Sequence, residues 1–147
     1  MDNEMKVEFD AISTNEAFAR VAVAAFMTPL NPTLEEIADV KTAVSEAVTN
    51  AIIHGYEQRK GKVSLHCWSE GQKLHIEVWD EGNGIADIPR AMEPLFTTKP
   101  EQERSGMGFS FMEAFMDELQ VQSQVGRGTR ITMEKKIAGQ PYALCKE

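Results

Sequence analysis

The chain is organised around one segment, Thr33-Leu-Glu-Glu-Ile-Ala-Asp-Val-Lys-Thr-Ala-Val-Ser-Glu-Ala-Val-Thr-Asn-Ala-Ile-Ile-His54. Thr33 followed by Glu36 has the pattern of a capping box, which predicts that a helix begins here. Apolar residues then recur at spacings of three and four and form one stripe along the helix: Ile37, Val40, Val44, Ala47, Val48 and Ala51. We therefore predict one long helix from Thr33 to His54 whose apolar stripe packs on the core.

Glu46 and Asn50 lie one turn apart on the other side of this predicted helix. Asn is disfavoured inside a helix because its amide competes for backbone hydrogen bonds. A carboxylate and a carboxamide at this spacing offer a base and an oxygen ligand for a hard metal ion to the same small volume. The alternative is a solvated glutamate beside a tolerated asparagine, because polar pairs four residues apart are common on helices.

Length, charge and cysteine use exclude several classes of protein. The 147 residues match a single domain, 1–147, and no repeat or Gly/Ser linker divides them. A formal charge of −8 argues against direct nucleic-acid binding by phosphate neutralisation. The apolar run Val21–Met27 is too short to span a membrane, and no signal peptide is visible, so we expect a cytoplasmic protein. Cys67 and Cys145 lack metal-ligand spacing, which predicts free thiols.

Alternating apolar and polar residues predict five strands, near residues 5–11, 62–69, 73–80, 119–125 and 129–137. Because every strand alternates, one face of the sheet should be exposed or shared with a partner. The elements together predict an α/β (α+β) two-layer sandwich, with a mixed, mostly antiparallel sheet and helices on one face.

A further helix is predicted between the first strand and the central helix. Ser13 with Glu16 has the pattern of another capping box. The apolar stripe expected to face the core consists of Phe18, Val21, Ala22, Ala25 and Phe26. Arg20 stands off this stripe and is expected to be exposed, where composition alone makes it a solubilising charge.

Asp80-Glu-Gly82-Asn-Gly84 follows directly after a predicted strand. Two glycines spaced by one residue let the backbone turn sharply and approach a ligand that a side chain would exclude. Asp80 would then direct a hydrogen-bond acceptor at that ligand. The alternative is an ordinary turn, since Asp and Gly are also the usual turn residues.

The segment from Ala86 to Ser105 has no regular periodicity and contains three prolines. Loops of about twenty residues in a compact domain are usually lids or binding segments. Gly106 and Gly108 then open a helix, an arrangement that binds phosphate because free amides and the helix dipole converge there. The alternative is a flexible helix start. Thr129, next to a glycine in the last predicted hairpin, either meets a ligand or is simply a good strand former.

These motifs stand in one order along the chain and resemble the N, G1 and G2 boxes of the GHKL ATPases and kinases, over roughly residues 34–137. Two stretches, Ser45–Tyr56 and Pro94–Phe109, resemble more closely the anti-sigma F factors of endospore-forming bacteria, as does the region around Arg20.

The resemblance implies that the chain binds ATP or ADP with Mg²⁺ and is a serine protein kinase. Asn50 would coordinate Mg²⁺, and Glu46 would be the general base. Asp80 would accept the adenine amino group with Thr129 beside it, while Gly82 and Gly84 would admit the ring. The remaining implied site residues belong to an ATP lid of about 86–108: Thr98, Lys99, Gly106 and Gly108 at the nucleotide, and Arg104 neutralising charge.

The resemblance also implies two protein partners: a sigma factor of the sigma F type that the chain inhibits, and an anti-anti-sigma factor that it phosphorylates on serine. Arg20 would lie in the surface that binds both, and a homodimer would form through the N-terminal strand region. Two alternatives stay open. One is a related kinase for a stress-response sigma factor, and the other is a nucleotide-gated binding module without phosphoryl transfer.

Overall fold

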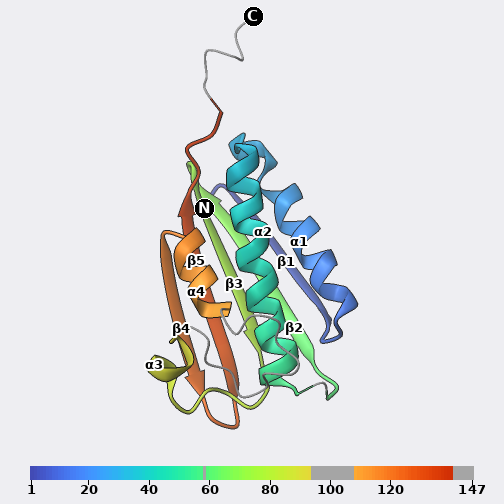
Figure 1. The fold of residues 1–147 in the computed structure, drawn as a ribbon. Coiled ribbons are helices and arrows are strands. Elements are labelled where there is room, and N and C mark those ends of the chain that lie inside the picture. Colours follow the sequence, from blue (N-terminus) through green and yellow to red (C-terminus); the bar gives the residue numbers. More distant parts are fainter. Residues whose placement is uncertain (58, 94–107, 141–147) are drawn as a thin grey trace, which may run out of the picture.

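The computed structural model in Figure 1 describes residues 1–57, 59–93 and 108–140. The elements in chain order are β1 (Asn3–Asp10), α1 (Thr14–Phe26), the 3₁₀ turn Thr28–Leu30, α2 (Leu34–Thr49), a π-helical segment Asn50–Gly55, β2 (Lys62–Glu70), β3 (Lys73–Asp80), α3 (Ile88–Ala91), α4 (Gly108–Phe115), β4 (Glu118–Gln124) and β5 (Gly128–Lys136). No helix in these described ranges is long and apolar enough to cross a membrane.

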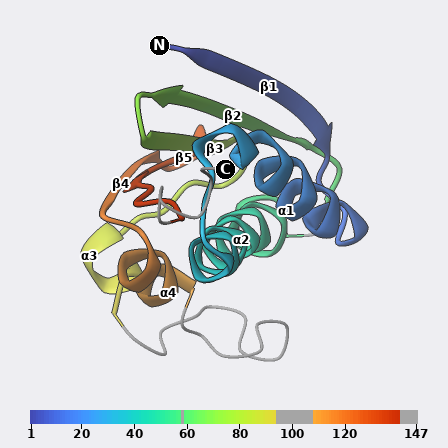
Figure 2. The ribbon, with the colours of Figure 1, turned by 90° about the horizontal axis from the view of Figure 1, so that it is seen from above.

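The strands form one sheet in the order β1-β2-β3-β5-β4, and every neighbouring pair is antiparallel. Figure 2 shows α1, α2 and α4 together on one side of this sheet. The predicted two-layer sandwich with helices on one face is therefore confirmed, and its sheet is antiparallel throughout. The five predicted strands agree with the observed ones to within one or two residues.

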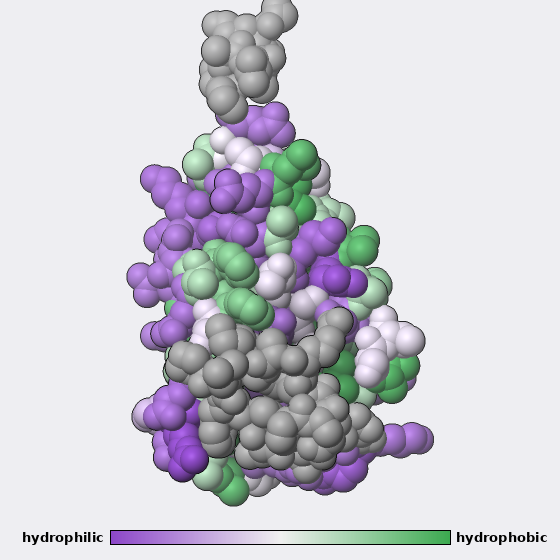
Figure 3. Space-filling view, in the orientation of Figure 1, coloured by the Kyte–Doolittle hydropathy of each residue, from purple (hydrophilic) through white to green (hydrophobic). Residues whose placement is uncertain are grey.

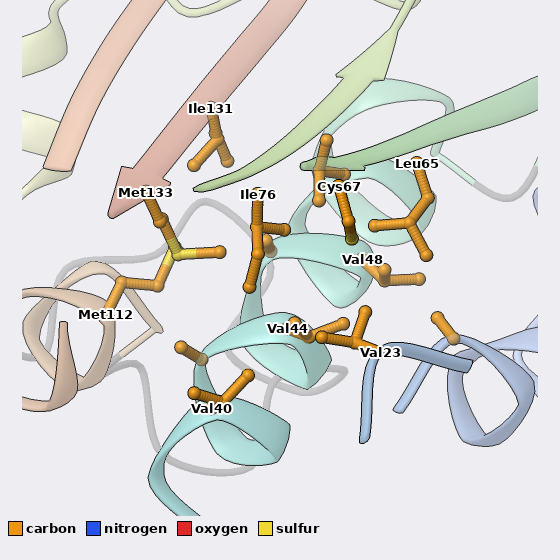
Figure 4. Packing of buried hydrophobic residues seen from close by; sticks show 14 of the residues in the cluster. Val23, Val40, Val44, Val48, Leu65, Cys67, Ile76, Met112, Ile131 and Met133 are labelled. Carbon is orange, nitrogen blue, oxygen red and sulfur yellow. The ribbon is translucent and has the colours of Figure 1, made fainter. Parts of the chain in front are cut away.

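The core lies between α2 and the sheet. Val40, Val44 and Val48 project from α2 towards the middle strands, as the apolar stripe predicts (Figure 4). They meet side chains of β2, β3 and β5, which include Leu65, Cys67, Ile76, Ile131 and Met133. Cys67 is a free thiol, as predicted, and burial raises its pKa to about 12. Cys145 lies outside the described residues.

The other face of the sheet is polar and aromatic. The Trp68 ring stacks on His75 with centroids 4.9 Å apart, and it also contacts His66. His66 Nε2 lies 2.7 Å from a carboxylate oxygen of Glu4 on the neighbouring strand. This composition matches the exposed face that the alternating strands predict.

The capping box that begins α2 is confirmed. Glu36 donates its backbone N–H to Thr33 Oγ1 at 3.1 Å, and Thr33 donates its N–H to Glu36 Oε1 at 2.9 Å. The same carboxylate accepts the N–H groups of Ala138 and Gly139, just after β5. Burial acts to raise the pKa of Glu36, but these backbone donors outweigh it and lower the pKa. The Glu36 side chain thus connects the start of α2 to the segment that follows β5.

The core-facing side of α1 differs from the prediction. Its buried residues are Ala19, Val23 and Met27, whereas Phe18 and Val21 are 48% and 63% exposed. Ser13 precedes the helix but its side chain caps nothing, so the predicted capping box is absent. Apolar residues occupy most positions of α1, so their spacing alone could not identify the buried side. In Figure 3, hydrophobic surface gathers on the right of the view, where Figure 1 places α1.

Arg20 also differs from the prediction, because its side chain is only partly exposed. Its Nε is buried and has no hydrogen-bond partner among the residues that the structure describes. Arg20 directly follows Ala19 in the chain, and Ala19 belongs to the buried stripe of α1. The side chain is therefore partly covered, and a buried donor of this kind is normally satisfied by a hydrogen bond.

Candidate functional site

Asp80 is the buried polar residue around which the site is built. It is the last residue of β3 and has only 3% of its surface exposed. Its side chain shares the inward face of the sheet with Ile76 and Val78, because alternate residues of a strand point the same way. Burial raises the pKa of Asp80 to about 6, although backbone N–H groups of Gly82 and Thr129 act in the opposite direction. Above that pH the site contains a buried carboxylate that only accepts hydrogen bonds.

Thr129 is brought directly beside Asp80 by the pairing of β3 with β5, in which Asp80 and Thr129 are opposite each other. Thr129 is also 3% exposed. Its hydroxyl lies 2.8 Å from the hydroxyl of Ser123 on β4. Three adjacent strands therefore place a carboxylate and two hydroxyls at one end of the sheet, on the face that the helices cover.

The glycines after Asp80 are packed against other parts of the backbone. A side chain at Gly82 would overlap the carbonyl of Gly55, and one at Gly84, where φ is +77°, would overlap the carbonyl of Gln124. Asn83 donates its N–H to Gly55 O at 2.7 Å. This close approach is a physical reason for glycine at both positions. Their predicted role of admitting an adenine ring stays a prediction.

We predicted one long helix to His54, but the α-helix does not continue that far. At Asn50 it changes to a π-helix that ends at Gly55. The backbone of Gly55 lies against Asp80, since a side chain there would be 2.8 Å from Asp80 Oδ1. Turns of this wider kind are rare and occur frequently at functional sites. Here the wider turn connects the Glu46 and Asn50 part of the helix to the Asp80 end of the sheet.

Glu46 lies beside the beginning of α4. A side chain at Gly108 would be 3.3 Å from Glu46 Oε1, so the carboxylate and the first residue of α4 are close neighbours. Asn50 follows one turn further along the same helix. The structure therefore brings together Glu46 with Gly108, and Asp80 with Gly82 and Thr129, and the helical segment ending at Gly55 joins the two groups.

Other predicted site residues lie outside the described residues or on another part of the fold. Thr98, Lys99, Arg104 and Gly106 lie outside the described residues. The part of the predicted lid that is described contains the one-turn helix α3, which the lack of periodicity did not indicate. Its first turn is capped by Asp87, which accepts the N–H of Arg90 at 3.1 Å. Arg20 lies on α1, which packs against α2, β1 and β2 (Figure 2).

Two residues that sequence reasoning missed support the site. The Tyr56 hydroxyl donates to Lys62 O at 2.6 Å and accepts the N–H of Glu81 at 2.8 Å, so it links the end of the helix to β2 and to the residue after Asp80. Ser123 contacts Thr129. The sequence could have indicated Ser123, because it continues the alternation of Leu119 and Val121 and therefore lies on the same, core-facing side of β4. No comparable signal marks Tyr56.

Replacing Asp80 with asparagine is expected to weaken adenine-nucleotide binding by about 1–3 kcal/mol, because the new amide places a donor where an acceptor was buried. The wild-type affinity should fall as the pH drops through about 6, where Asp80 gains a proton. Titrations of ADP from pH 5 to 8 measure both effects, and the asparagine variant should lack this pH dependence.

The same substitution can be checked through protein stability, whose pH dependence should be opposite to that of nucleotide affinity. The pKa of Asp80 is raised on folding from its ordinary value of 3.8 to about 6, so the folded protein binds more protons between these values. Its contribution to stability therefore decreases as the pH rises from 4 to 6. Thermal unfolding of the asparagine variant should not show this loss. Equal nucleotide affinity of both proteins at pH 8 would contradict the role of Asp80.

Comparison with known proteins is consistent with this geometry. Residues 10–135 match the family model of the histidine kinase-like ATPase domain. The chain is 59% identical to the anti-sigma F factor of Clostridium acetobutylicum, over 94% of this chain and 96% of the relative. It is 56% identical to the anti-sigma F factor of Geobacillus kaustophilus, over 99% of each.

Solved structures share the fold at low sequence identity. A crystal structure of the RsbU and RsbW domains of a Mycobacterium tuberculosis protein superposes with a TM-score of 0.67 at 20% identity, covering 92% of this chain and 32% of that chain. The catalytic domain of the histidine kinase ThkA gives a TM-score of 0.55 at 18% identity, covering 90% and 96%. At these identities the likeness shows the fold alone.

Proposed function

The chain belongs to the anti-sigma F factor family and carries a histidine kinase-like ATPase domain, and we propose that it is an ATP-dependent serine kinase that also binds and inhibits a sigma factor of the sigma F type. Its phosphoryl acceptor would be a serine of an anti-anti-sigma factor, which the modification inactivates. The single observation that carries the nucleotide part is the buried Asp80 carboxylate, paired in register with Thr129 and facing the helices.

The residues present suit an adenine nucleotide. Asp80 offers a buried acceptor for an exocyclic amino group, and such a group recovers the hydrogen bonding that the carboxylate loses on burial. Gly108 opens α4, where free backbone N–H groups favour phosphate oxygens. The predicted lid of about 86–108, with Thr98, Lys99, Arg104 and Gly106, is the part of the proposal that would close over the phosphates.

Glu46 and Asn50 divide the chemistry between them. Asn50 would help to hold Mg²⁺, which neutralises charge on the phosphates when it is bound. Within the described residues, no group of three or more His, Cys, Asp or Glu side chains is placed to hold a metal ion. Glu46 would take the proton of the acceptor serine while the serine oxygen bonds to the γ-phosphorus and ADP leaves.

The partner-binding part of the proposal places Arg20 in the surface for both proteins. Phe18 and Val21, close to Arg20 in α1, are large apolar side chains that are 48% and 63% exposed. Apolar contacts around an arginine are the composition expected at the centre of a protein interface. One shared surface would make sigma factor and antagonist mutually exclusive, so that either can displace the other.

A homodimer through the N-terminal strand region belongs to the same proposal. Among the strands of the described residues, β1 is an edge strand and pairs with β2 alone. An unpaired edge is a surface on which a second copy can associate. Light scattering at micromolar concentration should give the mass of two chains, and a monomer under these conditions would count against this contact.

Incubation with radiolabelled ATP, Mg²⁺ and a purified anti-anti-sigma factor tests the proposed function. We expect label to appear on a serine of the partner, and a partner with that serine changed to alanine is the matched control. Nucleotide-dependent partner binding without label would support the binding-module alternative. Copurification of a stress-response sigma factor from cells, in place of one of the sigma F type, would identify the related kinase.

A further inference from the structure

Ser123 has the complete set of hydrogen bonds that a hydroxyl can make. It accepts the backbone N–H of Ile85 at 2.7 Å, and its proton points to the carbonyl oxygen of Gly128 at 3.0 Å. Its third neighbour is Thr129 Oγ1 at 2.8 Å. A serine hydroxyl has one proton to donate and two lone pairs that accept. These three contacts therefore use all of its capacity.

The direction of the bond between the two hydroxyls follows from this count. The Gly128 carbonyl can only accept, so the Ser123 proton is committed to it. Ser123 must then accept from Thr129, and the single proton of the Thr129 hydroxyl is used in that bond. Thr129 is left with its lone pairs alone. Towards a ligand bound beside it, Thr129 would act as an acceptor, like the Asp80 carboxylate opposite it in the sheet.

We propose that Ser123 is a specificity-determining residue: by fixing the Thr129 hydroxyl as an acceptor, it makes the pocket select purines with a 6-amino group over purines with a 6-oxo group. This inference rests on the proposed nucleotide-binding function and adds a residue to it. Ser123 acts through Thr129 and is a positioning residue.

The chemistry of the two purine classes explains the selection. A 6-amino group has two N–H donors, which can serve two acceptors at once. A 6-oxo group presents a carbonyl oxygen at the same position, and it would face the acceptors Asp80 and Thr129 with no proton between them. Sites with buried acceptors reject ligands that leave them unpaired far more strongly than sites that rely on shape. If Thr129 could rotate and donate, one of these two penalties would disappear.

Binding of ADP and inosine diphosphate to the full chain, measured by calorimetry with Mg²⁺, tests the proposal. The readout is the ratio of the two dissociation constants. In Ser123→Ala, the Thr129 proton is free to turn towards a 6-oxo oxygen, and we expect the preference for ADP to fall by about tenfold, the range of one neutral hydrogen bond. A merely structural role of Ser123 would weaken both nucleotides equally and leave the ratio unchanged.

A Thr129→Val background isolates the mechanism. Without the Thr129 hydroxyl, Ser123→Ala should cause no further change in the ratio. Circular dichroism and thermal unfolding show whether each variant is folded, and Ser123→Cys, with a similar side-chain volume and a weakly accepting sulfur, replaces the alanine variant if that one unfolds.

An unchanged ratio in a folded Ser123 variant, or an equal change of the ratio in the valine background, would overturn the inference. The proposed function can fail separately from it. If the wild-type chain bound neither diphosphate, the nucleotide site itself would be wrong, and the inference would fall with it. If the wild type bound ADP and the ratio did not move, only the role of Ser123 would be lost.

Discussion

Replacing Glu46 with glutamine is expected to lower phosphoryl transfer to the partner serine by about 10²–10⁴-fold while ATP still binds. Glutamine keeps the shape of the side chain beside Gly108, where the carboxylate lies. It cannot accept the serine proton, so the transition state loses its base while the ground state is little changed. Single-turnover transfer of label to the partner gives the rate, and calorimetry with a nonhydrolysable ATP analogue gives the affinity.

Glu35→Gln is a matched control for this experiment. Glu35 is an exposed residue in the first turn of the same helix, and its replacement removes the same charge away from Gly108. This variant should phosphorylate the partner at the wild-type rate. Undiminished transfer by Glu46→Gln would remove Glu46 from the role of base. A loss of ATP binding in that variant would instead assign Glu46 to holding the nucleotide or its metal.

Arg20→Glu should weaken the binding of both the sigma factor and the anti-anti-sigma factor, by about 2–5 kcal/mol if the arginine pairs with a buried carboxylate of each partner. The Arg20 Nε is buried and lacks a hydrogen-bond partner among the described residues, so the guanidinium still has an unsatisfied donor. Arginine suits such a site because its planar fork binds carboxylates through two parallel hydrogen bonds. Binding isotherms for each partner measure the effect.

The specificity of this result depends on two controls. Arg130→Glu makes the same change of charge on β5, where the arginine is exposed and stacks on Trp79. It should leave both affinities nearly unchanged. Affinity for ADP should be the same in Arg20→Glu as in wild type, because α1 packs mainly against α2, with smaller contacts to β1, β2 and the 3₁₀ turn, whereas Asp80 ends β3 and Thr129 lies in β5. Unchanged binding of both partners would return Arg20 to a solubilising charge.

The parts of the fold with one periodic signal could be predicted from sequence. Val40, Val44 and Val48 repeat at intervals of four, and only one side of α2 is apolar, so its buried face was unambiguous. The strands alternate cleanly because the sheet has one covered and one exposed face. Asp80 and Thr129 were also identifiable, since Asp80 stands at a strand end two residues before Gly82 and Thr129 directly follows Gly128. Their burial and pairing required the structure.

The missed features depend on tertiary contacts that leave little trace in sequence. α1 is apolar on several sides, and its contact with α2 and the sheet decides that Ala19 and Val23 are buried and Val21 is exposed. The π-helix from Asn50 ends where Gly55 packs against Asp80 and Gly82, residues distant along the chain. The bond between Ser123 and Thr129 depends on the register of β4 with β5.

The pairing of β3 with β5 has a consequence for how the protein folds. Asp80 and Thr129 become neighbours only after the long chain segment between them has closed, and contacts of such sequence separation form slowly. The unfolded chain therefore lacks the paired Asp80 and Thr129 on which the proposed adenine site depends. A nucleotide that binds only the native state shifts the folding equilibrium by mass action, and each tenfold rise in its free concentration above the dissociation constant adds about 1.4 kcal/mol. The cellular nucleotide concentration would thus help to determine what fraction of this protein is folded.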